Sequence, residues 1–420
     1  MGNRIYYGEY SLKHWIELIL IKNITLPEYQ RSFVWDEKDI NRFMNSLKEN
    51  QFVPPVTIAH YKVQDEKTET NLILDGQQRL TSILLAYLNY FPNKDKFDNS
   101  DNELANEDDS ADEPSSEKKI IKWTFDELLK TDEKTSSIEK IKNKLASDSR
   151  YKCLNEKPIP DEDKFWETVF LGFCFIVPNS EDKTEIQKTF SRTFREINYF
   201  GKNLSAMESR RSLYFMNDKY KNYFDGKTKE KDVLCGLTII DNMQAIKIDF
   251  VRYLSIISQY KAQGNESGVL KNYSSFASRE SFYADYVSKI VGLEQESHEE
   301  KFNGCEMETI FSCYSWEDRF TELREEILIL KMQMEKDKKK DKADFESWIE
   351  ADYHLFGLIY FILFDNKKIK ISEEQLFKEL EKKIKEKRSD STYSKSPNRL
   401  TNLRARLKES IDIYSKYLIQ

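Results

Sequence analysis

Metal-binding and disulfide-forming residues are scarce in this sequence. Its 420 residues include five cysteines and four histidines, all scattered, and no two cysteines form a CxxC pair. The sequence therefore carries no signature of a zinc site or of a disulfide framework, and its cysteine usage is typical of a reducing compartment. The histidines also lack the His-Asn-His clustering with which HNH nucleases bind a metal and activate water.

Long apolar runs are absent as well. The most apolar stretch, residues 355–364, is too short to span a bilayer. The first residues contain neither the apolar core of a signal peptide nor the Ser or Thr of a myristoylation site. We therefore expect a cytoplasmic protein that does not enter a membrane.

Neither sign of charge dominates the sequence. Lysine and arginine number 66, and aspartate and glutamate number 73, which gives a net charge of −7. A negative net charge disfavours indiscriminate coating of DNA, which needs a positive field to displace counterions. It does not exclude DNA binding through a local basic patch. With 39% hydrophobic residues the chain can still bury a core, and its length fits two or three domains.

The first ninety residues alternate short helices and strands. Ser11 is placed to cap a helix that runs to about Lys22, and Asp36 opens a second helix with apolar residues at helical spacing. Two strands are predicted over residues 56–61 and 71–74. A third helix, with apolar residues on one face, follows the second of these strands.

The rest of the chain divides by composition. Residues 94–119 are acidic with almost nothing apolar, which predicts a disordered insertion; an acidic segment that mimics DNA is the alternative. Order resumes with a strand over residues 170–177 and a helix over 183–198. Beyond Cys235 we expect helices almost throughout, at residues 243–263, 278–293, 316–336, 343–363, 373–387 and 397–418.

These elements predict an α+β protein in which a sheet-containing N-terminal domain precedes a largely helical C-terminal domain. The predicted division is a core over residues 1–93, the acidic insertion over 94–119, the remainder of the N-terminal domain over 120–235, and the helical domain over 236–420.

The most informative string is Asp75-Gly76-Gln77-Gln78-Arg79, between a predicted strand and a predicted helix. Such a turn exposes the first amides of the helix, and these attract phosphate. Arg79 can present a planar fork of donors to phosphate oxygens, and Asp75 can bind Mg²⁺ or orient an attacking water. Gln77 and Gln78 can hydrogen-bond a phosphate, a base or water. The alternative is purely structural, with Asp75 as a helix cap, Gly76 as a turn and Arg79 in solvent.

A second string lies upstream, at residues 27–35. It combines aromatic residues with Gln30 and Arg31 in an extended segment ahead of the second helix. Phe33 and Trp35 are predicted to pack. No helical periodicity explains Gln30 and Arg31, so they are candidates for ligand binding.

Together these strings resemble the N-terminal domain family of the GmrSD type IV restriction endonucleases, a domain related to the ParB and sulfiredoxin fold. The resemblance is carried by Gln30-Arg31-x-Phe-x-Trp35, by Pro54-Pro55-Val56 and by the string from Asp75 to Thr81. A further block fits too, from Phe194 to Asn198 and on to Gly201, Leu204, Ser205 and Glu208. These blocks cover about the first half of the chain.

The resemblance implies that this domain binds and hydrolyses a nucleoside triphosphate (NTP) with Mg²⁺, and that hydrolysis is coupled to the sensing of modified phage DNA. It implies catalytic roles for Asp75, Gln78 and Arg79, with Asp75 as the metal ligand. The residues that it assigns to nucleotide binding are Gln30, Arg31, Gly76, Gln77, Thr81 and Asn198. Ser205 and Glu208, by contrast, are explained as a capping box.

Many relatives carry an HNH nuclease in their C-terminal half, and this chain departs from them because His298 and His354 stand alone. The leading hypothesis is therefore an NTP-hydrolysing sensor that works with a separate nuclease subunit; association of the chain with itself is left open. Three rivals remain. They are a ParB-like nucleotide-dependent DNA-binding switch, a self-contained modification-dependent endonuclease, and an interaction protein in which the motif is a structural relic.

Two further strings favour structural interpretations. Gly226-Lys227-Thr228 resembles the end of a phosphate-binding P-loop, but no apolar strand precedes it, so a charged turn is predicted. A basic stretch near the C-terminus can follow a DNA backbone or form a solvated face balanced by acidic residues, and we favour the solvated face. Its residues are Lys395, Arg399, Arg404, Arg406 and Lys408.

Overall fold

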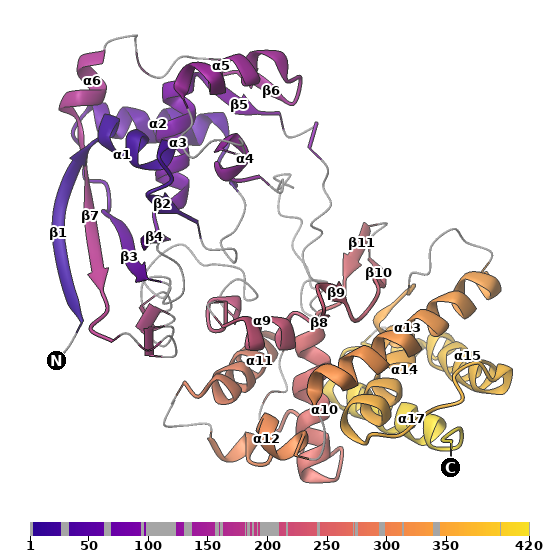
Figure 1. Cartoon of the computed structure of the whole chain (residues 1–420). Coiled ribbons are helices and arrows are strands. Elements are labelled where there is room, and N and C mark those ends of the chain that lie inside the picture. Colours follow the sequence, from indigo (N-terminus) through magenta and orange to yellow (C-terminus); the bar gives the residue numbers. More distant parts are fainter. Residues whose placement is uncertain are drawn as a thin grey trace. The chain divides into compact units, whose positions relative to one another are not determined.

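The computed structural model divides the chain into two compact units, one ending at residue 216 and one spanning residues 217–420 (Figure 1). The described residues are 3–26, 33–62, 69–93, 96–97, 123–129, 137–155, 159, 163–180, 182, 185–186, 189–190, 192–193, 210–215, 217–241, 244–271, 273, 276–293, 299–312, 315–338, 345–394 and 396–419. His298 and the predicted acidic insertion, apart from residues 96–97, lie outside them. The finer domain boundaries drawn from the sequence stay predictions.

A five-stranded mixed sheet organises the N-terminal unit, with strand order β1-β7-β3-β4-β2. Its strands are β1 (Arg4–Ser11), β2 (Ile24–Thr25), β3 (Val56–Lys62), β4 (Glu69–Asp75) and β7 (Phe170–Val177). β3 runs parallel to β7, and β2 parallel to β4, whereas the pairs β1–β7 and β3–β4 are antiparallel. A separate ribbon pairs β5 (Tyr90–Pro92) with β6 (Tyr151–Cys153). The three strands predicted for this part of the chain are confirmed.

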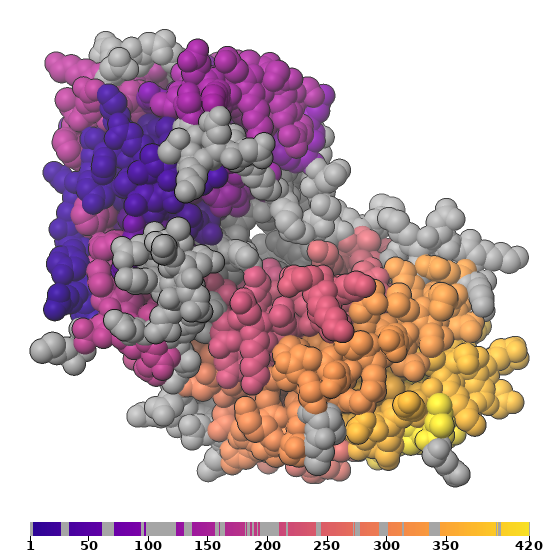
Figure 2. Space-filling view, viewed as in Figure 1, coloured from indigo at the N-terminus to yellow at the C-terminus, as the bar shows by residue number. Residues whose placement is uncertain are grey.

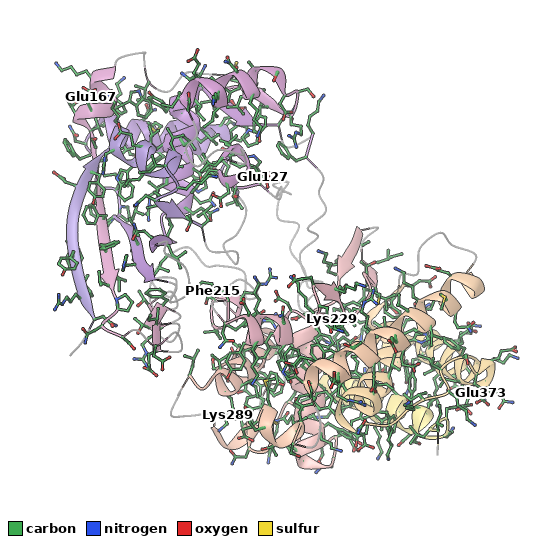
Figure 3. All side chains as sticks on the ribbon, in the orientation of Figure 1. Glu127, Glu167, Phe215, Lys229, Lys289 and Glu373 are labelled. Atoms are coloured by element: carbon green, nitrogen blue, oxygen red, sulfur yellow. The ribbon has the colours of Figure 1, made fainter. Side chains whose placement is uncertain are left out.

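Side chains alternate between the two faces of the sheet, as the period of a strand requires. One face packs against helices into a large core, which includes Val56, Ile58, Ile73 and Leu171. The helices of this unit are α1 (Leu12–Leu20), α2 (Glu37–Lys48), α3 (Gln77–Leu88), α4 (Asp126–Leu129), α5 (Ile138–Ser147) and α6 (Asp163–Thr168). The opposite face carries a smaller cluster, made of Ala59, Leu74, Ile176, Ile186 and Phe190, with Phe215 packed against it (Figure 3). Both faces are therefore covered.

Strand β1 forms one edge of the sheet, and its side chains are largely exposed. Tyr6 and Tyr7 are 49% and 76% exposed, and the indigo atoms of β1 lie at the surface of the unit in Figure 2. Gly8 pairs with Phe173 on β7, and a Cβ at Gly8 would lie 2.6 Å from that ring. Glycine at this position therefore leaves room for the phenyl ring to cover the edge strand.

The first two helices begin where the sequence places their caps. Oγ of Ser11 accepts the backbone N–H of His14 at 3.2 Å, at the start of α1. Asp36 and Asp39 form a reciprocal capping box at the start of α2, with hydrogen bonds of 2.9 and 3.1 Å. Such side-chain acceptors satisfy N–H groups that the helix itself leaves without partners. Both helix predictions are confirmed.

The C-terminal unit is largely helical, which confirms the predicted α+β class of the chain. Its helices are α9 (Asp218–Phe224), α10 (Phe250–Gln263), α11 (Phe276–Val291), α12 (Met307–Ile310), α13 (Trp316–Lys338), α14 (Trp348–Ile359), α15 (Glu374–Ser389), α16 (Ser391–Ser394) and α17 (Leu400–Ser415). A 3₁₀ turn spans Glu299–Phe302, and a π-helical turn, Tyr360–Phe364, extends α14. Among the described helices, none has the length and apolar character that crossing a bilayer requires.

Two short hairpins also belong to this unit. They pair β8 (Lys227–Thr228) with β9 (Lys231–Asp232), and β10 (Thr238–Asp241) with β11 (Gln244–Lys247). In the sequence string that resembles a P-loop, Gly226 lies in a turn with φ 62°, as predicted, whereas Lys227 and Thr228 form β8.

The second hairpin corrects two helix predictions. The helix predicted from residue 243 is wrong in its first part, because β11 comes first and α10 begins only after the cap Asp249. The helix predicted from residue 343 also begins later, after the cap Ser347. Both segments pair with β10: residues 244–247 form the hairpin with it, and Phe345 pairs with Ile239 and exchanges backbone hydrogen bonds of 2.8 and 2.9 Å with that strand. The periodicity of either segment alone does not reveal this distant pairing.

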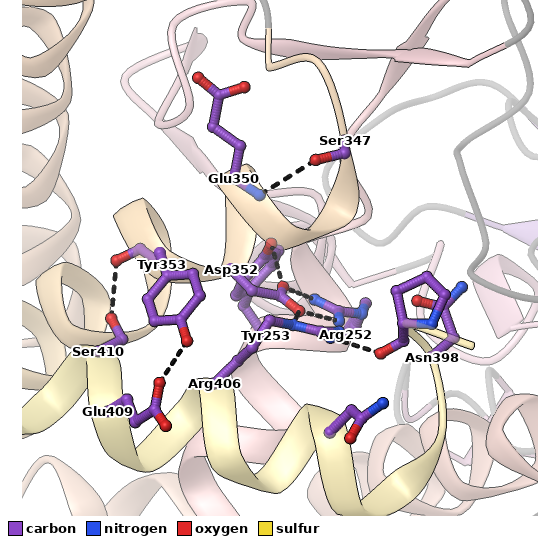
Figure 4. Close-up of polar contacts among 12 residues, drawn as sticks. Arg252, Tyr253, Ser347, Glu350, Asp352, Tyr353, Asn398, Arg406, Glu409 and Ser410 are labelled. Carbon is purple, nitrogen blue, oxygen red and sulfur yellow. Dashed lines mark hydrogen bonds and ion pairs between the residues drawn. The ribbon is translucent and has the colours of Figure 1, made fainter. Parts of the chain in front are cut away.

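A buried ion cluster joins α10, α14 and α17 (Figure 4). Asp352 accepts hydrogen bonds from Arg252 at 2.7 and 3.0 Å and from Nε of Arg406 at 2.8 Å. All three side chains are at most 1% exposed. Burial alone would raise the pKa of Asp352, but the two guanidinium groups hold it below its usual value.

The cluster overturns part of the prediction for the basic C-terminal stretch. Arg406 lies in the core of the unit rather than on a solvated face. Arg404 donates to the carbonyl oxygen of Val269 at 2.8 and 2.6 Å, and is also tied to the protein. Lys408 does lie in solvent, 3.3 Å from Glu266, as predicted. The sequence could not separate these residues because charge alone does not report burial.

Candidate functional site

The turn between β4 and α3 carries the most informative motif of the sequence. Asp75 is the last residue of β4, and Gly76 opens α3 with φ 102° and ψ 7°. A Cβ at Gly76 would lie 2.9 Å from Cγ2 of Val56, and residues with side chains rarely adopt this φ. Both the backbone conformation and the close packing of the turn on β3 therefore require glycine.

The first turn of α3 has no side-chain cap, because its N-cap residue is Gly76. The N–H groups of a first helical turn have no carbonyl partner within the helix, and they attract anions. Arg79 donates from Nη2 to Oδ2 of Asp75 at 2.6 Å and to the carbonyl oxygen of Pro55 at 3.4 Å. The side chain of Asp75 is 42% exposed and that of Arg79 is 14% exposed. An anion-attracting helix end, a guanidinium and a reachable carboxylate thus lie together.

The purely structural alternative for this motif is right for Gly76 and wrong for Asp75 and Arg79. Gly76 does form the turn. Asp75 is not the helix cap, since Gly76 holds that position, and Arg79 is mostly buried rather than in solvent.

Both glutamines of the motif are buried, with Gln77 6% and Gln78 7% exposed. Oε1 of Gln78 accepts the backbone N–H of Val34 at 3.0 Å and that of Trp35 at 3.4 Å. Val34 and Trp35 belong to the second string of the sequence, 44 and 43 residues away. The two strings therefore meet in the folded chain, through a side-chain contact that the sequence did not predict.

Aromatic packing fixes this part of the second string. Phe33 is fully buried, with its ring centroid 6.3 Å from that of Phe91 and 5.9 Å from that of Trp123. Its backbone N–H donates to the carbonyl oxygen of Trp123 at 2.8 Å. The ring of Trp35 packs edge-on against Phe43 of α2 at 5.5 Å. The packing roles predicted for Phe33 and Trp35 are confirmed.

The other predicted nucleotide-binding residues are distributed differently. Thr81 lies one turn further along α3, is fully buried, and its Oγ1 has no hydrogen-bond partner in the described part of the chain. Gln30, Arg31 and Asn198 lie outside the described residues. Their roles in binding stay predictions.

Two backbone groups at the site were missed by the sequence analysis, namely the carbonyl of Pro55 and the amide of Val34. The first could have been found, because a hairpin of the two predicted strands places the start of β3 beside the end of β4. The structure shows this register, with Thr57 opposite Asp75. The second has no local signal, since it depends on a contact between distant segments.

The carboxylate of Asp75 fits a ligand of Mg²⁺. Its Oδ2 is paired with Arg79, whereas its Oδ1 has no hydrogen-bond donor among the residues that the structure describes. Mg²⁺ commonly uses one or two carboxylates together with waters and phosphate oxygens. No group of three or more His, Cys, Asp or Glu side chains within the described ranges is placed to hold a metal.

The N-terminal unit is similar to a known protein family. Residues 12–215 match the family model of the GmrSD restriction endonuclease, N-terminal domain. This part of the chain belongs to that family. The match confirms the resemblance drawn from the motif blocks and includes the β4–α3 turn. The family takes its name from a restriction endonuclease.

Other similarities are local. The chain is 35% identical over 89 residues to the uncharacterized protein MJ0686 of Methanocaldococcus jannaschii. This match covers 17% of the chain and 15% of that protein. No solved structure matched the chain.

Proposed function

We propose that the GmrSD domain of this chain binds and hydrolyses an NTP with Mg²⁺ at the β4–α3 turn, and that hydrolysis is coupled to sensing modified phage DNA. The observation that carries the proposal is the ion pair of Asp75 with Arg79 at the uncapped start of α3. The family assignment supports a setting in DNA restriction. The relation of this domain to the ParB and sulfiredoxin fold is part of the proposal and rests on the motif blocks.

Each group at the turn has a distinct proposed role. The N–H groups of the first turn of α3 receive phosphate oxygens, and Gly76 lets the ligand approach the backbone. Arg79 exchanges its partner Asp75 for phosphate oxygens, whose negative charge its planar donors match. Asp75 is then free to hold Mg²⁺, which neutralises phosphate charge, or to orient the attacking water. Without nucleotide, the ion pair keeps both side chains in position.

The surroundings of His354 in the C-terminal unit bear on the choice between an internal and a separate nuclease. His354 is 3% exposed and lies between the rings of Phe345 and Phe377, at 5.7 and 6.1 Å. A buried histidine in an aromatic environment is not placed to activate water on DNA. We therefore propose that a separate nuclease subunit cleaves the DNA, and that the assembly acts in the cytoplasm.

The proposal is tested by phosphate release from the full chain with each of four NTPs and Mg²⁺, with and without modified phage DNA. Asp75→Asn and Arg79→Ala are expected to lower turnover by about 100-fold or more, the typical effect of removing a group that stabilises the transition state. Asp148→Asn is a matched control, because Asp148 pairs with Arg150 at 2.6 Å in the same unit but away from the turn. Turnover that modified DNA stimulates, and that only the two motif variants lose, supports the proposal.

The rival functions give different results in the same assay. A ParB-like switch binds nucleotide and changes its DNA affinity with little turnover. A self-contained endonuclease cuts modified DNA without a partner. Absence of both nucleotide binding and turnover in the wild-type protein rejects the proposal and favours an interaction protein.

A further inference from the structure

Gln78 makes a different contact from the charged residues of its motif. Asp75 and Arg79 pair with each other at the turn, whereas Oε1 of Gln78 accepts two backbone N–H groups from a distant segment. Those groups belong to Val34 and Trp35, which lie in neither a helix nor a strand. Partly buried backbone donors gain from an acceptor, and the side chain of Gln78 supplies one where no sheet or helix does.

A glutamine is chemically suited to this task. Its carbonyl oxygen has two lone pairs and can accept from two donors at once. At 7% exposure the oxygen meets little competition from water, so the contact is worth more than the same contact at the surface. The neighbouring residues of the segment are fixed by packing, Phe33 in the core and Trp35 against α2. The hydrogen bonds of Gln78 add a polar contact between this segment and α3.

The segment also connects two helix starts. Asp36, the residue after Trp35, caps α2. Gln78 lies in the first turn of α3, next to Arg79. The contact of Gln78 with the segment therefore joins the start of α3, where the nucleotide is proposed to bind, to the start of α2.

We infer that Gln78 is a positioning residue: it holds residues 33–35 against the first turn of α3, so that the two sequence strings act as one nucleotide site. This inference rests on the proposed function and deepens it. In place of the catalytic role suggested by the resemblance, Gln78 acts through the backbone of Val34 and Trp35.

Two variants of the full chain test this role, with a matched control in the other unit. Gln78→Met removes the acceptor with little change of volume, and Gln78→Glu keeps an oxygen acceptor for the two amides. The control is Gln259→Met. Gln259 is 2% exposed on α10, and its Oε1 accepts the backbone N–H of Leu270 at 2.8 Å. This hydrogen bond is of the same kind as that between Gln78 and Val34, and it lies outside the GmrSD domain.

The first readout is amide hydrogen exchange without ligand. Gln78→Met is expected to speed exchange at Val34 by about five- to tenfold, the effect of losing one hydrogen bond, with a smaller change at Trp35. Gln78→Glu restores slow exchange. Gln259→Met speeds exchange at Leu270 and leaves Val34 unchanged.

The second readout is calorimetric binding of tripolyphosphate with Mg²⁺, followed by kcat and KM for the NTP that the wild-type protein hydrolyses fastest. Gln78→Met is expected to weaken tripolyphosphate binding and raise KM by about tenfold, with a smaller change in kcat, because a misplaced segment weakens binding. Gln78→Glu recovers most of the affinity, and Gln259→Met keeps wild-type affinity.

The outcomes separate the inference from the proposed function. Unchanged exchange at Val34 in Gln78→Met overturns the positioning role, whatever the wild-type protein binds. A fall of kcat at unchanged KM and affinity also overturns it, and points to direct catalysis by Gln78. If the wild-type protein binds neither tripolyphosphate nor NTP, the proposed function is rejected, and with it the role of Gln78 in a nucleotide site. Hydrogen exchange at Val34 then still shows whether Gln78 holds the segment in place.

Discussion

Replacing Asp352 with asparagine removes the negative charge from a cluster that holds three helices of the C-terminal unit together. Arg252 from α10 and Arg406 from α17 both donate to this carboxylate on α14, and the hydroxyl of Tyr253 donates to it at 2.9 Å. Asparagine keeps the shape but offers one acceptor oxygen, and its NH₂ group meets the guanidinium donors. The variant therefore leaves two buried cations without their counter-ion.

The size of the loss follows from this burial. Arg252 is 1% exposed, and Arg406 and Asp352 are fully buried. Removing one partner of a buried ion cluster costs about 3–5 kcal/mol, because the charges left behind are out of contact with water. For a unit of this size each kcal/mol shifts Tm by about 2–4 °C. The expected fall in Tm of the C-terminal unit is therefore about 6–20 °C.

The same carboxyl gives the stability a defined pH dependence. Burial would raise the pKa of Asp352, but Arg252 and Arg406 lower it by more, so its pKa in the folded protein is below its usual value. Such a group stabilises the fold above its unfolded pKa, about 3.9, and loses this contribution as the pH falls through the folded pKa. The variant has no such contribution to lose. The difference in Tm between wild type and variant is expected to be constant from pH 7 to about pH 5 and to narrow below about pH 4.

Thermal unfolding of the full chain, followed by far-UV circular dichroism over this pH range, measures both effects. Hydrogen exchange of α14 assigns the shifted transition to the C-terminal unit. Asp365→Asn is the control, since Asp365 pairs with Lys261 at 2.6 Å at a partly exposed position and its loss should cost less than about 1 kcal/mol. If Asp352→Asn melts within about 2 °C of wild type, the two arginines are compensated in another way and the reasoning is refuted.

Three further predictions concern single side chains. Gly76→Ala is expected to lose about 1–3 kcal/mol of stability and to abolish NTP turnover, because the new Cβ meets Val56 at a φ that alanine avoids; thermal unfolding and phosphate release check this. Burial, with nearby acidic side chains, raises the pKa of Glu326, so its ionisation at higher pH opposes folding; Glu326→Gln should raise the free energy of unfolding at pH 7 by less than about 1 kcal/mol and leave it unchanged at pH 4, as thermal unfolding measures. Arg406→Ala should cost about 3–5 kcal/mol, whereas Lys408→Ala should leave Tm unchanged; equal stability of the two variants would contradict the placement of Arg406 in the core.

The sequence by itself determined the local elements and the chemistry of the motif. Ser11 and Asp36 start their helices because a side-chain acceptor at the N-cap is a local property of a few residues. The strand–turn–helix at residues 69–88 could likewise be predicted, since an apolar strand, a glycine and a segment with apolar residues at helical spacing follow one another directly along the chain. The family could be recognised from the same short strings, which keep their order along the chain.

Tertiary structure decided which distant residues meet. The contact of Gln78 with Val34 joins segments 44 residues apart, and no local pattern marks either partner. The pairing of β10 with β11 and with Phe345 turned the starts of two predicted helices into extended chain. The burial of Arg406 could not be predicted either. A buried arginine and an exposed arginine have the same appearance in a sequence, and only the fold places Asp352 beside Arg406. Local preferences act over a few residues, whereas burial and pairing depend on the packing of the whole unit, and only the folded chain contains that information.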